Sequence, residues 1–305
     1  MQMPEHEDFD DYDVFLDTWE PSELLQHSTL RPYLYDPMSR ERLFSDLSGV
    51  GGVTRTPFMQ GLKVMEAGEA NLRRHKFFEE NHSEWSKHFR EDVLSNGIDR
   101  PSFDAFVSGF AELWIDGRSR RQDSRVMMGI KASIRDYDRR HHRSVAGKFV
   151  VNSINDSIAP MFTPDQMGAI FSANERLLET YIPSYMDVLG CDVLQSINNL
   201  YVRRGVCMPS IERFRKELHY LSSYSLALGP VEQFAQTWTD ATRNTGVPSI
   251  FAAPLPAVQK RVVAFAPFIE GMDLSQLELV VAPPIEPTPL ENHGQHGGIY
   301  EFSFE

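Results

Sequence analysis

The stretch TPDQMGAIFSANERLLETYIP, residues 163–183, contains the clearest helix start in the chain. Thr163 and Gln166 have the spacing of a capping box, in which each side chain accepts a hydrogen bond from the backbone amide of the other residue. Pro164 stands at the first helical position, where the missing N–H leaves no hydrogen bond unmade. Apolar residues then recur at helical spacing as far as Pro183, where we expect the helix to end.

Helical spacing continues on both sides of this stretch. Towards the N-terminus it predicts a helix near 69–94, a shorter helix capped by Ser102 and stopped by Gly117, and a helix through Val126 and Ile134. Towards the C-terminus it predicts helices near 184–201, 210–227 and 230–243.

The pattern changes after Gly246, where eight prolines exclude long helices. Three short segments there have the composition of β-strands, namely residues 261–269, 276–281 and 299–304. The predicted fold is therefore mainly α. A helical body (about 61–244) lies between an acidic extended N-terminal arm (1–60) and a proline-rich C-terminal arm (245–305) that carries a few short strands.

Composition restricts the class of protein. The 305 residues are enough for one large domain or two ordinary ones, and 41% hydrophobic and 11% aromatic residues exclude wholesale disorder. No apolar run reaches the roughly 18 residues of a membrane span, and the acidic start excludes a secretory signal peptide. The two cysteines, Cys191 and Cys207, fit buried thiols in a reducing compartment. We expect a cytoplasmic protein, or one within an assembled particle, without a membrane partner.

Charge is distributed unevenly along the chain. The net charge is −13, yet residues 117–143 hold nine Lys or Arg against three Asp, a local excess of +6. Residues 1–20, in contrast, contain eight acidic residues and no basic one. Because arginine forms planar, paired hydrogen bonds with carboxylates and phosphates, the basic segment favours an anionic partner.

The predicted anion or nucleic-acid surface consists of eight arginines: Arg118, Arg120, Arg121, Arg125, Arg135, Arg139, Arg140 and Arg143. The plainer interpretation is a solvated helix face whose last arginines complement the helix dipole. No helix-turn-helix, zinc finger or aromatic RNA-binding motif is present, so any nucleic acid would be held by its backbone.

A second set of residues could bind metal. The run from Glu79 to His82 has the Glu-x-x-His spacing of ferritin-like di-iron sites, although such sites use two copies of it. The full predicted ligand set is Glu79, His82, Glu112, Asp138 and His142. The same acidic run, with lysines nearby, is also typical of an exposed helix face.

Two functions follow from these patterns. The first is a self-assembling structural protein, such as a coat, capsid or nucleocapsid-like virion subunit, that exchanges arms between subunits and contacts RNA or another anion through its arginines. It would be a homo-oligomer or larger assembly, bind nucleic acid without sequence preference, and need no cofactor. The alternative is a helical di-iron carboxylate oxidase.

Overall fold

The fold is given by a computed structural model of the 305-residue chain. The residues that it describes are 67–115, 118–119, 125–142, 157–188, 200–208, 221–227, 230–231, 234–235, 246–286, 288–296 and 299–304. The predicted arm over residues 1–60 lies outside them, and the division of the chain at residues 60 and 244 stays a prediction.

The first helix, α6 (Ala67–Ser95), confirms the helix expected near 69–94. Of the five residues predicted to share its apolar face, four are buried, with exposed fractions of 2% or less, namely Phe78, Trp85, Phe89 and Val93, and the fifth, His82, is half-buried. Local spacing was sufficient here because the helix buries a single stripe of large side chains.

The short helix α7 (Arg100–Ser108) starts three residues earlier than expected. Its cap is Asp99, whose carboxylate accepts from the Ser102 amide at 2.9 Å, so Ser102 is not the cap. Pro101 then stands in the first turn. A π-helical turn, η1 (Gly109–Leu113), follows and leads into the two-residue strand β1 (Trp114–Ile115), which pairs with β2 (Arg118–Ser119).

The helix α9 (Pro164–Val188) confirms the capping box. The Thr163 amide donates to Gln166 Oε1 at 3.0 Å, and the Gln166 amide donates to Thr163 Oγ1 at 3.3 Å. The expected end at Pro183 is wrong, since the helix continues five residues further. Ile182 and Tyr185, both fully buried, hold this part of the helix, and their burial offsets the hydrogen bond that proline cannot make.

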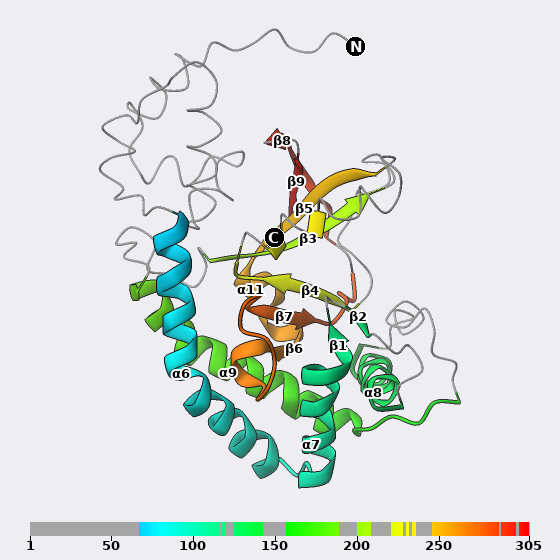
Figure 1. The fold of residues 1–305 in the computed structure, drawn as a ribbon. Coiled ribbons are helices and arrows are strands. Elements are labelled where there is room, and N and C mark those ends of the chain that lie inside the picture. Colours follow the sequence, from blue (N-terminus) through cyan, green and yellow to red (C-terminus); the bar gives the residue numbers. More distant parts are fainter. Residues whose placement is uncertain are drawn as a thin grey trace, which may run out of the picture.

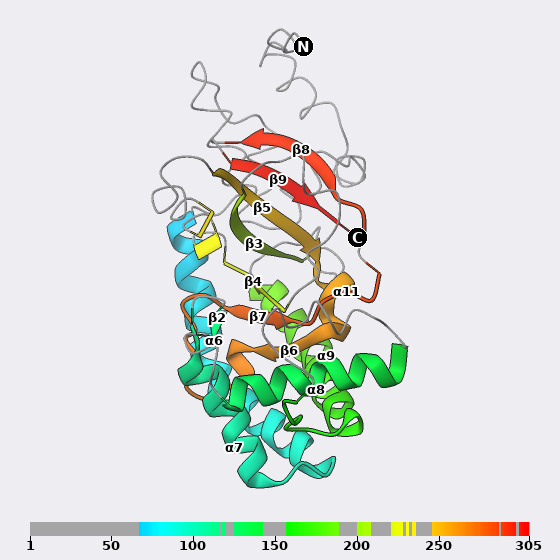
Figure 2. The ribbon, with the colours of Figure 1, turned by 90° about the vertical axis from the view of Figure 1, so that its right-hand side faces the viewer.

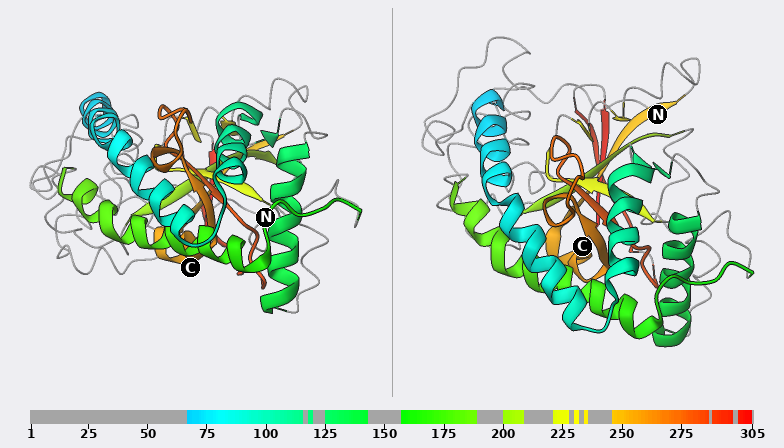
Figure 3. Two further views of the ribbon diagram at one scale, coloured as in Figure 1. Left: turned by 90° about the horizontal axis from the view of Figure 1, so that it is seen from below. Right: turned by 60° about the horizontal axis from the view of Figure 1, so that its bottom comes forward.

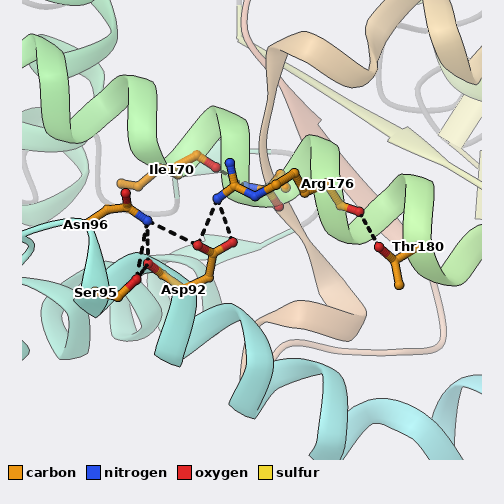
Figure 4. A network of polar contacts seen from close by, with 7 residues as sticks. Asp92, Ser95, Asn96, Ile170, Arg176 and Thr180 are labelled. Carbon is orange, nitrogen blue, oxygen red and sulfur yellow. Dashed lines mark hydrogen bonds and ion pairs between the residues drawn. The ribbon is translucent and has the colours of Figure 1, made fainter.

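The helices α6 and α9 lie side by side and antiparallel (Figures 1 and 3). Trp85 stacks on Tyr181 with ring centroids 4.6 Å apart. Closer to the C-terminus of α6, Arg176 Nη2 of α9 donates to both carboxylate oxygens of Asp92 at 2.7 and 2.8 Å (Figure 4). The aromatic contact and the ion pair, in which one guanidinium nitrogen contacts both carboxylate oxygens, therefore fix the register of the two helices.

The described residues also form a seven-stranded sheet, which makes the predicted mainly α fold wrong. Its strands are β3 (Tyr201–Met208), β4 (Ser222–Ser225), β5 (Val247–Pro254), β6 (Val262–Phe265), β7 (Glu278–Val281), β8 (Glu291–His296) and β9 (Ile299–Ser303). The spatial order is β6-β7-β4-β3-β5-β9-β8. The sheet is mixed, because β5 and β9 run parallel while the other pairs are antiparallel.

Two strands lie in the segment that helical spacing had assigned to the helical body. β4 falls inside the helix expected over 210–227, and β3 begins where the helix over 184–201 was expected to end. β3 pairs along all eight of its residues with β5, whose partner residues are 39 to 53 positions away in the chain. Because the backbone hydrogen bonds of a strand come from such distant partners, apolar spacing alone could not identify these strands.

The three strands predicted near the C-terminus are confirmed as β6, β7 and β9. All three lie in the same sheet as β3 and β4. β7 lies between β6 and β4, and β9 lies between β5 and β8, so both are interior strands of the sheet. Figure 2 shows the strands one above another from β8 to β6, with the helices gathered at the β6 end.

Helices and sheet share one apolar core at this end. Phe78 of α6 meets Phe265 of β6 edge to face at 5.9 Å, and Phe268, in the 3-10 turn η6 (Ala266–Phe268), lies 6.2 Å from Phe89. α9 also contacts β6 and the turn η5 (Gln259–Arg261), which follows the short helix α11 (Leu255–Val258). None of the described helices combines the length and the apolar character that crossing a membrane requires.

Candidate anion-binding surface

The basic segment forms the helix α8 (Arg125–His142), whose middle is buried on several sides. Seven of the nine positions from 127 to 135 are buried, namely Met127, Gly129, Ile130, Ala132, Ser133, Ile134 and Arg135. A solvated helix would bury one stripe only. Burial of α8 therefore covers more than one stripe, and the solvated face of the plainer interpretation would be confined to the two ends of the helix.

Two contacts hold the covered sides of α8. The segment that precedes α9 lies against it, with the Met161 amide donating to Gly129 O at 3.1 Å and the Phe162 amide to Ser133 Oγ at 2.8 Å. On another side, Lys131 Nζ lies 5.9 Å from the centroid of the Trp114 ring. Burial lowers the pKa of Lys131, which fits an amine enclosed against this indole.

The Trp114 indole in turn connects α8 to the sheet. Its Nε1–H donates to Glu278 Oε1 of β7 at 2.9 Å and to Ser223 Oγ of β4 at 3.2 Å. The middle of α8 is thus connected through Trp114 to two interior strands of the sheet.

The exposed arginines of α8 lie at its two ends: Arg125 begins the helix, and Arg139 and Arg140 lie in its last turn. Fourteen residues at 1.5 Å each separate Arg125 from Arg139 by about 21 Å, and about 100° per residue brings the two to nearly the same face. Arg140 lies about 100° around the helix from Arg139, towards α9. There its Nη1 lies 3.6 Å from Asp165 Oδ2.

Arg135 does not belong to this surface, although its residue type suggested that it would. It is 4% exposed, and its Nε donates to Asp136 Oδ1 at 2.8 Å. Its Nη2 donates to Ile158 O at 3.4 Å, so the guanidinium is enclosed by the segment before α9. Spacing along the helix could not reveal this, because the covering segment follows about twenty residues later.

Of the other predicted arginines, only Arg118 is among the described residues. Arg118 lies in β2, where it pairs with Ile115 of β1. Arg120, Arg121 and Arg143 lie outside the described residues.

The predicted metal ligands do not come together as far as the structure describes them. Glu79 and Glu112 are exposed, and His82 Nδ1 is within 3.0 Å of Pro267 O. Asp138 is buried on α8, and the side chain of His142 is outside the described residues. Among the described side chains, no group of three or more His, Cys, Asp or Glu could hold a metal ion.

Asp138 has an unusual environment nonetheless. It is 6% exposed, and this burial raises its pKa to about 7, while the charge of Arg261 acts in the opposite direction. Arg261 itself donates to Ala282 O at 2.8 Å, which holds it at the end of η5. The carboxyl group thus belongs to the buried side of α8 and feels the charge of η5.

The sequence interpretation missed three charged side chains buried in the sheet. Arg203, Glu278 and Glu301 are 3%, 7% and 4% exposed. The strand register places Arg203, Ser225 and Glu278 in one row across β3, β4 and β7. β9 buries Glu301 and Ser303 on one face and Phe302 on the other, while Tyr300 is half-buried. The buried charges have polar contacts, such as that of Arg203 Nη1 with Tyr201 O at 3.2 Å.

Comparison of the chain with protein families, curated proteins and solved structures finds no match in any of the three.

Proposed function

We propose that this protein is a self-assembling structural subunit that contacts the phosphate backbone of nucleic acid through the exposed arginines of α8. The observation that carries the proposal is the combination of a buried helix middle with exposed arginines at both ends. A helix anchored in this way presents guanidinium groups without a further entropic cost of ordering the backbone.

The spacing of these arginines suits an extended polyanion. About 21 Å between Arg125 and Arg139 corresponds to about six nucleotides along one strand of a duplex. Contacts that far apart supply affinity and orientation but no base readout, as expected for binding without sequence preference.

The acidic net charge of −13 does not oppose such contact. Charges are screened over about 8 Å at physiological ionic strength, so an acidic segment acts weakly beyond that distance. The exposed arginines of α8 then govern contact with phosphate.

Assembly is proposed to depend on residues 1–20. They carry eight acidic residues together with aromatic ones, a composition that suits docking on a basic surface of a neighbouring subunit. The C-terminal strands β8 and β9 pair within their own sheet, so arm exchange is proposed for the N-terminal segment alone. No observation among the described residues favours the di-iron oxidase.

One experiment tests both parts of the proposal. Light scattering and the ratio of absorbance at the nucleic-acid and protein maxima are measured for the full chain and for a chain lacking residues 1–20. We expect the full chain to form large particles that retain nucleic acid, and the shortened chain to remain folded but small. A shortened chain that assembles normally refutes the role of the acidic segment.

The arginine contact is tested separately by replacing Arg139, Arg140 and Arg143 together with alanine. Each lost phosphate contact should reduce the log–log salt dependence of binding by about 0.7 to 0.9, so the triple variant should lose about two to three in slope. If the triple variant assembles and retains nucleic acid as the unmodified chain does, the arginines only face solvent.

A further inference from the structure

The exposed arginine nearest to α9 already has an anion beside it. Arg140 Nη1 lies 3.6 Å from Asp165 Oδ2, and the two side chains are 57% and 71% exposed. The pair connects the last turn of α8 with the first turn of α9. Because both groups stay in contact with water, the ion pair can open without leaving a buried charge unpaired.

The start of α9 does not need this ion pair. The capping box between Thr163 and Gln166 satisfies its first amides, and Gln166 Nε2 also donates to Gly97 O at 2.9 Å. Asp165 lies in the first turn, where the helix dipole stabilises a carboxylate in any case. Opening the pair therefore leaves the helix intact and Asp165 in a favourable position.

We propose that Asp165 is a built-in competitor that occupies Arg140 until a phosphate group of a nucleic acid displaces it. This inference rests on the proposed function and adds an element of regulation to the same surface. A carboxylate and a phosphate compete for the same guanidinium, and phosphate carries more charge and more acceptor oxygens. The effect is selectivity for a polyanion, which contacts Arg139 as well, over small anions that meet Arg140 alone.

The expected size of the effect follows from the exposure of the pair. An exposed ion pair corresponds to about a 1.5- to 5-fold change in an equilibrium constant. Asp165→Asn should accordingly tighten binding of the nucleic acid by about 2- to 5-fold, and the removed repulsion between Asp165 and phosphate acts in the same direction.

The test measures fluorescence anisotropy of a labelled single-stranded DNA of mixed sequence with the full chain at low salt. Four proteins are compared: the unmodified chain, Asp165→Asn, Arg140→Ala and the double variant. We expect Asp165→Asn to bind more tightly, Arg140→Ala to bind more weakly, and the gain from Asp165→Asn to disappear when Arg140 is absent. The last result distinguishes competition for Arg140 from a general change in net charge.

Asp104→Asn is the matched control. Asp104 is 52% exposed, lies on α7, and forms a comparable exposed ion pair with Arg100 at 3.8 Å. If this control tightens binding as much as Asp165→Asn, or if the gain from Asp165→Asn persists without Arg140, the competitor is refuted while the proposed function stands. If the unmodified chain does not bind the DNA but does bind a peptide of residues 1–20, the partner is the acidic segment of a second copy. The nucleic-acid contact and the inference then both fail.

Discussion

Replacing Asp138 with asparagine should stabilise this protein at alkaline pH. The carboxyl group is 6% exposed, and burial raises its pKa from 3.8 to about 7. The folded chain therefore holds a proton on Asp138 more tightly than the unfolded chain does. Stability from this group is fully present below about pH 3.8 and is lost progressively as the pH rises towards 7.

The magnitude follows from the shift of about three pKa units. At about 1.4 kcal/mol per unit, the ionised carboxylate costs the folded state at most about 4 kcal/mol once the pH exceeds 7. Asparagine has nearly the same shape and cannot ionise, so Asp138→Asn removes this cost. The gain in the free energy of unfolding should be about 2 kcal/mol at about pH 5.5 and about 4 kcal/mol at about pH 8.5.

Urea denaturation of both proteins at these two pH values measures the gain. Asp104→Asn, which removes a carboxylate 52% exposed to solvent, serves as the control and should show no such widening with pH. A gain that is the same at both pH values, or a loss of stability at pH 8.5, would refute the assignment of a buried, protonated carboxyl group to Asp138.

Three further predictions concern the packing. Gly205→Ala should lower the thermal stability of the protein, because the added Cβ would lie 1.8 Å from the backbone oxygen of Val231 and β3 could not pack as it does. A variant with unchanged thermal stability would contradict that contact. Asp92→Ala and Arg176→Ala should show a coupling energy of about 0.5 to 1 kcal/mol in a double-mutant cycle measured by urea denaturation, and this energy should decrease with added salt. Additive effects would mean that the ion pair contributes nothing to stability. Thr163→Ala should cost about 1 kcal/mol in the same assay and Thr163→Ser much less; equal losses would rule out the hydroxyl as the cap.

The candidate surface could be located from the sequence but not delimited by it. The excess of arginine in residues 117–143 was visible as composition, and α8 forms where apolar spacing indicated. Which of these arginines are exposed to solvent depends on contacts with segments distant in the sequence, and local spacing does not reveal those contacts. Arg135 is enclosed by the segment at Ile158, and Arg140 is directed to Asp165 by the position of α9.

The elements that the sequence by itself determined are those whose stabilising contacts are local. The capping box at Thr163 and Gln166 and the buried stripe of α6 are set by residues three or four positions apart, and both were predicted correctly. Only the tertiary structure decided that 201–208 and 222–225 are strands, because their backbone hydrogen bonds come from β5 and β7, whose paired residues are 39 to 59 positions away. It also decided that α9 continues past Pro183, since burial of Ile182 and Tyr185 outweighs the lost hydrogen bond. Burial and long-range strand pairing are properties of the folded chain, and a local sequence pattern does not predict them.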